Sequence, residues 1–430
     1  MLKTAIKRTL IVLLSVSLMC QAVMADGIQI EKRNSTDPIV FANPEAPTAE
    51  NPQKVIIDTD MVECFDDGVA MILMDKTPSI ELLGVTVVAG NSSMPNGVSS
   101  AVRQLEAIGS DTPVYEGSRV GMRPYRVNSE YMDAEETFAP NISWGGYLRY
   151  SLDPEKYNTI DMDPYAAWQD VYEYKYGESP AYEYVYGLDN PDAEGNRDAV
   201  DFLISMANKY PGEITLLAIG PCTNIARAIL EDPSFPSKIK EIVYMGGSFY
   251  QEGNASAVSE FNWWADPDAA KMCVRASWGN PESETGKAYG NQIISGLEVS
   301  EHAGAMPQDV YEKMVEDTYP GIRELFIEKN GDKAPSNIWD VIAAAQIIDP
   351  SITIAWNDHE VGDETSVQGV FGVYVDVDSE MTPDYGRSIA YKEGRLGPVG
   401  TKKAAIQNYI DVDRFWNEIV YPAMVDPENK

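Results

Sequence analysis

Short apolar runs alternate with helix-like segments along most of the chain, and each run is typical of a strand buried on both faces. Strands are predicted at residues 54–57, 80–88, 112–115, 214–219 and 241–245. Helices are predicted at 68–73, 98–108, 198–210, 223–230 and 340–348. Repeated strand–helix units joined by short turns predict an α/β fold, with a mostly parallel open sheet flanked by helices.

The interval 121–196 interrupts this alternation. It holds about half of the chain's 24 tyrosines, with many acidic residues between them. A structureless loop of that length is uncommon within a compact domain. We therefore interpret the interval as an insertion packed on the sheet, either as a lid over a binding site or as surface decoration.

The first 53 residues have a different composition from the rest. A basic start and the apolar run 10–19 precede small residues, which predicts a secretory signal peptide over 1–25. Met19 is bulky for a position before a lipidated cysteine, so we do not expect a lipoprotein anchor at Cys20. Residues 26–53 are rich in Asn, Pro, Thr and Glu and are predicted to be a linker before a domain at 54–425.

The predicted leader places the protein outside the cell or in the periplasm. No later segment is apolar enough for stable membrane insertion. The formal charge of −34 argues against nucleic acid as a partner. Removing the leader leaves three cysteines, which is too sparse and odd a set for a disulfide framework.

Four carboxylates follow the first predicted strand, in the segment VIIDTDMVECFDDG. Asp58 and Asp60 stand at the strand end, and Asp66 and Asp67 begin the next helix. Ligands bind at this end of the strands in open parallel sheets. Adjacent acids are costly unless a cation or helix N–H groups offset their charge. The pattern therefore predicts a calcium or magnesium site, with helix capping as the alternative.

Two enzyme families begin with a strand of this kind. Haloacid-dehalogenase-type phosphatases open with apolar residues and Asp-x-Asp, a pattern that Asp58 and Asp60 satisfy. Nucleoside hydrolases open with Asp-x-Asp followed closely by Asp-Asp, which Asp66 and Asp67 supply. The later segments distinguish the two.

Four later segments resemble the inosine-uridine preferring nucleoside hydrolase family and occur in that family's order. They are VTVVAGN at 85–91, LLAIGPCTNIA at 216–226, the MGG, GN, EFN and ADP motifs within 245–267, and WD at 339–340. The resemblance covers most of 54–422 except the tyrosine-rich insertion, and it implies a nucleoside hydrolase fold with a Rossmann-like core.

The resemblance also implies roles for individual residues. A calcium ion would be held by Asp60, Asp67, Asp340 and the main-chain carbonyl of Ile219. The ribose hydroxyls would be held by Asp66, Asn91, Asn254, Glu260 and Asn262. Asp60 would take the proton from the attacking water, and nearby carboxylates would stabilise an oxocarbenium-like transition state.

Many members carry a histidine before the last metal-binding Asp, where this chain has Trp339. The purine-specific branch also has tryptophan there, so the resemblance implies a purine base stacked on Trp339 as it leaves. Trp144, in the insertion, is a candidate second stacking partner. Simple packing at a helix start is the alternative role for Trp339.

The acidic motif departs from the common family pattern by two extra residues between Asp60 and Asp66. Val62 does not readily take a positive φ, so we expect the loop to run differently here. We expect a calcium-dependent hydrolase of ribonucleosides, with purine nucleosides favoured, that is free to form a homo-oligomer. The alternative is a secreted nucleoside- or sugar-binding protein without turnover.

Overall fold

The computed structural model describes residues 47–123, 159–187, 198–358, 372–380, 382–391 and 397–429. The predicted signal peptide and Trp144 lie outside the described residues, as does nearly all of the predicted linker. Among the described residues, no helix has both the length and the apolar character needed to cross a bilayer.

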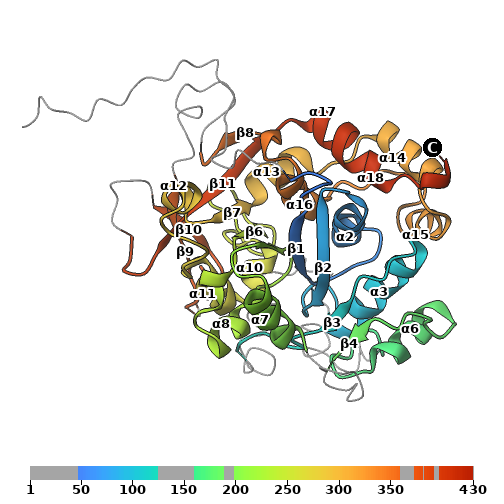
Figure 1. Ribbon diagram of the computed structural model, residues 1–430, viewed down its shortest axis with the longest axis horizontal. Helices are drawn as coiled ribbons and strands as arrows, with labels where there is room; N and C mark the ends of the chain where they lie inside the picture. The colour runs from blue at the N-terminus through green and yellow to red at the C-terminus, as the bar shows by residue number, and fades with distance from the viewer. Residues whose placement is uncertain are drawn as a thin grey trace, which may run out of the picture. The chain divides into compact units, whose positions relative to one another are not determined.

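One mixed sheet organises the described chain, with the order β10-β9-β11-β7-β6-β5-β1-β2-β3-β4 and with β8 paired to β11 (Figure 1). The strands from β11 to β4 pair in parallel, and β8, β9 and β10 add antiparallel pairs at one side. The predicted mostly parallel α/β fold is therefore confirmed. The strands are β1 (Gln53–Thr59), β2 (Ile80–Val87), β3 (Val114–Glu116), β4 (Val185–Tyr186), β5 (Ile214–Ala218), β6 (Glu241–Met245), β7 (Gln292–Ser295), β8 (Thr353–Trp356), β9 (Val373–Val377), β10 (Ser388–Tyr391) and β11 (Lys402–Ile410).

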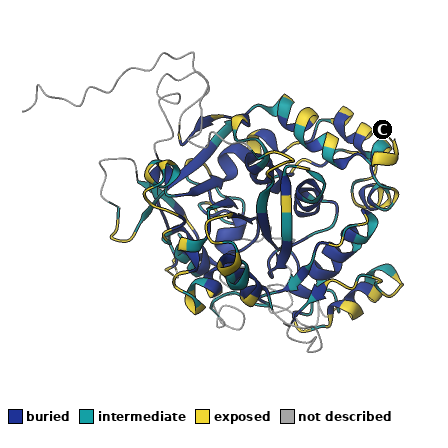
Figure 2. Cartoon of the chain, in the orientation of Figure 1, coloured by how far each residue is buried: buried dark blue, intermediate teal, exposed yellow. Residues whose placement is uncertain are grey.

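The central strand β1 is buried on both faces, as its apolar sequence predicts. Val55 and Ile57 belong to one hydrophobic core, whereas Ile56, which points to the opposite face, belongs to a second. All three side chains are fully buried. Figure 2 shows the same arrangement, with the sheet dark at the centre and exposed residues on the outer sides of the helices.

Helices cover both faces of the sheet, and each face has its own core. The first core takes apolar side chains mainly from α2 (Asp66–Lys76), α3 (Met94–Ala107), α13 (Leu297–Ala303), α14 (Gln308–Asp317), α15 (Pro320–Asn330), α16 (Asp340–Ile348), η3 (Phe415–Val420) and α18 (Tyr421–Met424). The second takes them mainly from α7 (Ala199–Lys209), α8 (Thr223–Glu231), α9 (Phe235–Lys238) and α11 (Pro267–Val274). The remaining helices of the described residues are α6 (Trp168–Tyr176), α10 (Phe261–Ala265), α12 (Glu284–Tyr289), η2 (Pro350–Ile352), α17 (Val412–Arg414) and η4 (Pro427–Asn429).

The helix predicted at 98–108 starts four residues earlier than expected, at Met94. Ser93 caps it by accepting a hydrogen bond from the Asn96 N–H at 3.3 Å, and Pro95 occupies the first turn. Serine and proline at these positions are standard helix-start signals, which hydrophobic periodicity alone does not reveal.

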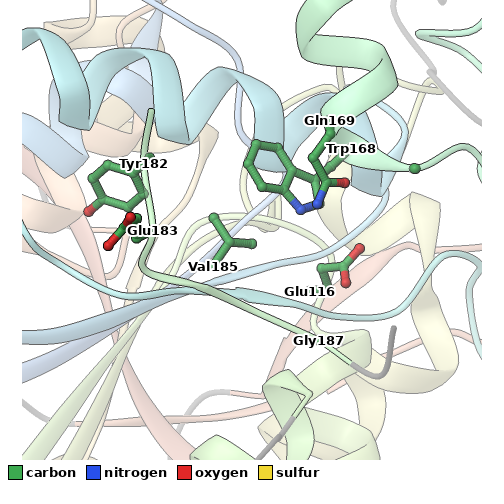
Figure 3. Close-up of a pocket in the computed structure, with 8 residues that line it drawn as sticks. Glu116, Trp168, Gln169, Tyr182, Glu183, Val185 and Gly187 are labelled. Atoms are coloured by element: carbon green, nitrogen blue, oxygen red, sulfur yellow. The ribbon is translucent and has the colours of Figure 1, made fainter. Parts of the chain in front are cut away.

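The described part of the tyrosine-rich insertion packs against the sheet and its helices. β4 pairs in parallel with β3 and extends the sheet by one strand. α6 lies against α3 and buries Trp168 and Tyr172. Between α6 and these strands, Trp168, Glu116 and Val185 line a hollow of about 230 Å³ (Figure 3). This part of the insertion is therefore an integral layer of the fold.

Asp58 ties several elements together at the carboxyl end of β1. Its Oδ1 accepts hydrogen bonds from Thr86 Oγ1 on β2 at 2.6 Å and from Asn224 Nδ2 on α8 at 2.8 Å. Asn224 Oδ1 accepts the N–H of Ser118 at 2.7 Å, just beyond β3. Asp58 is therefore a structural anchor beneath the site.

Replacing Asn224 with Ala should lower the free energy of unfolding by about 2–3 kcal/mol, since it removes one of the two donors to the buried Asp58 Oδ1 and leaves the Ser118 N–H without its acceptor. Urea unfolding measures this change. The exposed Asn208→Ala is the control and should change stability by less than about 0.5 kcal/mol. Equal, small effects of both substitutions would contradict the anchoring role.

Candidate active site

Four carboxylates from three separate elements meet at one end of the sheet. Asp60 follows β1, Asp66 and Asp67 begin α2, and Asp340 begins α16. Each residue is at most 5% exposed. One carboxylate oxygen from each of Asp66, Asp67 and Asp340 lies within 4.8 Å of the others. The chain therefore folds so that acids about 270 positions apart in sequence share one buried place.

Two helix starts bring the acids together. α2 and α16 pack against each other, and both begin with an acidic first turn. The free N–H groups at a helix start favour negative charge, so each helix offsets part of the repulsion between its own acids and those nearby. Neither helix has a side-chain cap, so its first turn is free to face the site.

Two of these carboxylates keep an oxygen without a partner in the described part of the chain. Asp60 Oδ2 accepts the Asn91 N–H at 2.5 Å, while Asp60 Oδ1 is buried without a hydrogen bond. Asp67 Oδ1 accepts the hydroxyl of Thr59, while Asp67 Oδ2 is likewise unpartnered. Buried oxygens are rarely left unpaired, and these two atoms are positioned to serve as ligands of a cation.

Two glycines permit the backbone to pass close to Asp60. A Cβ on Gly90 would lie 2.1 Å from Asp60 Oδ2, and a Cβ on Gly220 would lie 2.7 Å from the Asp60 N. Neither distance is compatible with a side chain. Glycine at these two strand ends therefore leaves the room that the carboxylate occupies.

Burial, and then mutual repulsion, raises the pKa of each of Asp60, Asp66 and Asp340 well above its usual range. For Asp67, burial dominates and raises the pKa to about 7. A divalent cation would reverse these shifts because it attracts the ionised form. The oxygen-only donor set and the two unpartnered oxygens fit a hard cation such as calcium or magnesium.

A cavity of about 510 Å³ opens beside the acidic cluster. Eight residues of the predicted site line it: Asp66, Asn91, Ile219, Asn254, Glu260, Asn262, Trp339 and Asp340. Asp60 and Asp67 lie behind this wall and are fully buried. The structure thus brings together every predicted site residue that it describes, and Trp144 falls outside the described residues.

Glu260 is held by backbone donors. Its carboxylate accepts the N–H groups of Asn262 at 2.7 Å, Gly247 at 2.9 Å and Trp263 at 3.1 Å, so it caps the start of α10. Burial nevertheless raises its pKa to about 7. The segment EFN therefore places a rigid carboxyl group at the cavity wall.

Asn262 and Asn254 are fixed by the same short segment. Asn262 Nδ2 donates to the carbonyls of Ile219 and Met245, each at 3.1 Å. The predicted main-chain ligand Ile219 therefore already accepts one hydrogen bond and keeps its second lone pair. Asn254 Oδ1 accepts the Phe261 N–H at 2.9 Å, and its buried Nδ2 has no partner among the described residues. That nitrogen is available to a substrate hydroxyl.

The extra residues before Asp66 place no positive φ on Val62, in line with the expectation for a β-branched residue. The positive φ falls on Cys64 instead, at 45°. The Cys64 N–H donates to Gln104 Oε1 at 2.8 Å, which holds the loop in this conformation. Burial raises the pKa of the Cys64 thiol, so this cysteine is a neutral space-filler.

Sequence reasoning missed a second set of polar residues in the cavity wall. Glu63 comes from the extra residues, Asn96 from α3, Lys175 from α6, Lys329 from α15 and Asn337 from the segment before Trp339. None of them stands in a recognisable motif. Only the position of Glu63 beside the acidic segment offered a sequence signal.

The match to known proteins extends over nearly the whole described chain. The family model for inosine-uridine preferring nucleoside hydrolases matches residues 55–417. The chain belongs to this family. It is accordingly a hydrolase of the N-glycosidic bond of ribonucleosides, and the phosphatase alternative is wrong.

Individual relatives have low sequence identity to this chain, but the matches extend over long stretches of it. The nucleoside hydrolase is 28% identical to the pyrimidine-specific ribonucleoside hydrolase RihB of Escherichia coli O1:K1 / APEC, covering 85% of this chain and 95% of RihB. It is also 28% identical to the probable uridine nucleosidase 1 of Oryza sativa subsp. japonica, covering 51% of this chain and 54% of the rice protein. The chain thus spans only about half the length of the rice relative.

A solved structure with the same fold is the purine-preferring ribonucleoside hydrolase from Gardnerella vaginalis. The TM-score is 0.58 at 22% sequence identity, covering 86% of this chain and 98% of the other. The fold of this nucleoside hydrolase is therefore that of its family.

Without divalent cations, this nucleoside hydrolase should lose stability as the pH rises from about 5 to about 8. Unfolded carboxyls release their protons near pH 4, whereas buried ones such as Glu260 keep theirs until about pH 7. The folded state thus binds more protons in this window, and its stability falls as those protons leave. The thermal midpoint, followed by circular dichroism in a chelator, measures this slope.

Adding calcium should raise that midpoint, and should raise it most at the alkaline end of the window. Asp340→Asn, which removes one charge from the cluster, should reduce the gain. A thermal midpoint that changes neither with pH nor with added calcium would rule out the acidic cluster as a cation site.

Proposed function

We propose that this nucleoside hydrolase cleaves purine ribonucleosides outside the cytoplasm with the help of a bound calcium ion. The observation that carries the proposal is the meeting of a buried acidic cluster, a polar wall and Trp339 in one cavity. The proposed location of the protein outside the cytoplasm rests on the predicted signal peptide at residues 1–25.

Asp60, Asp67, Asp340 and the Ile219 carbonyl would hold the ion. When bound, calcium supplies a positive charge that gathers the ribose diol and a water molecule and makes that water easier to deprotonate. Asp60 belongs in this set because its Oδ1 is buried without a partner and its charge interacts with those of Asp66 and Asp67.

The reaction then depends on groups of this chain. Asp60 accepts a proton from water, the water oxygen attacks C1′ of the ribose, and the C1′–N bond breaks with its electron pair leaving on the base. Asp66 and Glu260, with Asn91, Asn254 and Asn262, hold the ribose. The two carboxylates also stabilise positive charge at C1′ in the transition state.

The leaving base requires help, and no histidine among the described residues lines the cavity to supply it. His302 does not line the cavity, and His359 lies outside the described residues. Trp339 lines the cavity and offers an aromatic face on which a flat purine stacks as it departs. The named relatives include both a pyrimidine-specific and a purine-preferring enzyme, so they do not decide the base, and the proposed preference for purines rests on Trp339.

Asp60→Ala should lower kcat for inosine by roughly 10²- to 10⁴-fold or more, since it removes the proposed base. Chromatographic release of hypoxanthine measures the rate, and circular dichroism checks the fold. The exposed Asp201→Ala on α7 is the control and should keep full activity. Turnover that survives in the Asp60 variant would exclude Asp60 as the base.

A protein that binds ribonucleosides without ever releasing base would instead support the alternative of a binding protein. Calorimetric titration with inosine, in calcium and in chelator, distinguishes the two functions because it detects binding independently of turnover.

Trp339→Ala should slow cleavage of purine nucleosides by roughly 3- to 10-fold more than cleavage of 4-nitrophenyl riboside. The nitrophenolate leaves readily without stacking, so its rate reports the rest of the site. Equal losses for both substrates would mean that Trp339 only packs at the start of α16.

A further inference from the structure

One stretch of the cavity wall has no role in the mechanism above. Glu63, Asn96 and Lys175 line the cavity there, and they come from the loop before α2, from α3 and from the insertion helix α6. Glu63 shares its loop with Asp60 of the acidic cluster, whereas Asn96 and Lys175 stand on helices that carry none of the proposed ribose-binding residues. With the ribose at the proposed ribose-binding residues, we assign the base to this stretch of the cavity.

The Lys175 ammonium has no capacity left for a ligand. Its three N–H groups are directed to Asn96 Oδ1 at 2.8 Å, to Ser100 Oγ at 2.9 Å and to Glu63 Oε1 at 2.9 Å. Lys175 is therefore a clamp that holds Glu63 and Asn96 in fixed positions.

The Glu63 carboxylate has accepting capacity to spare. Oε1 accepts from Lys175 and from the hydroxyl of Tyr176 at 3.3 Å, whereas among the described residues Oε2 accepts only from Ser100 Oγ, at 2.7 Å. A carboxylate oxygen accepts two hydrogen bonds, so Oε2 has room for another donor. Asn96, whose carbonyl oxygen faces Lys175, keeps its NH₂ group as a donor.

Glu63 is also permanently an acceptor. Burial acts to raise its pKa, but the charge of Lys175 and the hydrogen bonds from Ser100 and Lys175 outweigh it and lower the pKa to about 2. The ionised group carries no proton to donate at neutral pH, so it accepts an N–H and repels a lone pair.

We propose that Glu63, fixed by Lys175, is a specificity-determining residue that accepts the N1–H of a 6-oxopurine base, with the Asn96 amide donating to the neighbouring O6. This inference rests on the proposed function and adds the choice of base to it. Adenine presents a lone pair at N1 and a donor at its 6-position, which is the opposite pattern. Adenosine would therefore place two like groups against Glu63 and Asn96.

The structural alternative is that Glu63 and Lys175 only anchor α6 to the loop. An anchor would affect all substrates alike, because the loop leads directly into Asp66 and Asp67. A specificity determinant affects substrates according to the edge of their base. Comparing substrates within one variant separates the two roles.

The test measures kcat/KM for inosine, adenosine and 4-nitrophenyl riboside in the wild-type enzyme and in Glu63→Gln. The wild-type enzyme should prefer inosine over adenosine by roughly 10- to 100-fold, the worth of one charged hydrogen bond made or lost. In Glu63→Gln, whose amide both donates and accepts, that ratio should fall at least tenfold through KM. Its rate with the nitrophenyl substrate should stay within about threefold.

Two controls keep the test decisive. Glu178→Gln breaks another glutamate ion pair of the insertion region, with Arg103 at 2.6 Å, and lies outside the cavity wall, so the inosine-to-adenosine ratio should not change. The wild-type enzyme with 1-methylinosine, which lacks the N1–H, should lose roughly 10- to 100-fold in kcat/KM. That measurement holds even if Glu63→Gln fails to fold.

An inosine-to-adenosine ratio near one in the wild-type enzyme would overturn this inference, as would a ratio that Glu63→Gln leaves unchanged. Equal losses on all three substrates would assign the pair to anchoring alone. Failure of the proposed function is distinct, because the wild-type enzyme would then cleave neither inosine nor adenosine, whatever its rate with the nitrophenyl riboside.

Discussion

Four buried carboxylates, those of Asp60, Asp66, Asp67 and Asp340, lie together at one end of the sheet, and the surrounding elements are arranged to stabilise their charge. Burial and mutual repulsion raise the pKa values of Asp60, Asp66 and Asp340, so the cluster is costly as isolated protein. Two helix starts supply N–H groups and two glycines supply room, yet an oxygen on Asp60 and one on Asp67 stay unpartnered. A bound cation would offset this cost and, in the proposed function, would leave the same carboxylates able to bind a ribose.

The fold provides the geometry for this arrangement. Parallel strands end on one side of the sheet, so the residues after β1, β2, β5 and β6 reach the site although they are distant in sequence. Helix α16 then adds Asp340 and Trp339 from the far end of the chain. The insertion contributes α6, which closes one side of the cavity through Lys175. The α/β framework thus supplies most of the site, and the insertion completes the cavity wall.

Sequence patterns predicted the α/β fold, the acidic cluster and the proposed ribose-binding residues, but not the second set of polar residues in the cavity wall. Strand β1 followed from a run of apolar residues, and the acidic segment followed from charges that need a partner. Lys175 escaped notice because nothing in its local sequence marks it; only the packing of α6 on α3 brings it to Glu63. The loop conformation was also beyond sequence reasoning, since the positive φ at Cys64 depends on a hydrogen bond to Gln104, 40 residues away.

The central claim is that the acidic cluster exists to hold one divalent cation. Isothermal titration of calcium into the cation-free protein tests it most directly, in several buffers of different ionisation enthalpy at pH 7. Because the described residues form one acidic cluster, we predict one ion per chain. Because its buried carboxyls keep their protons to unusually high pH, we also predict a net release of protons on binding. Absence of stoichiometric binding, or binding with no proton release, would contradict the account.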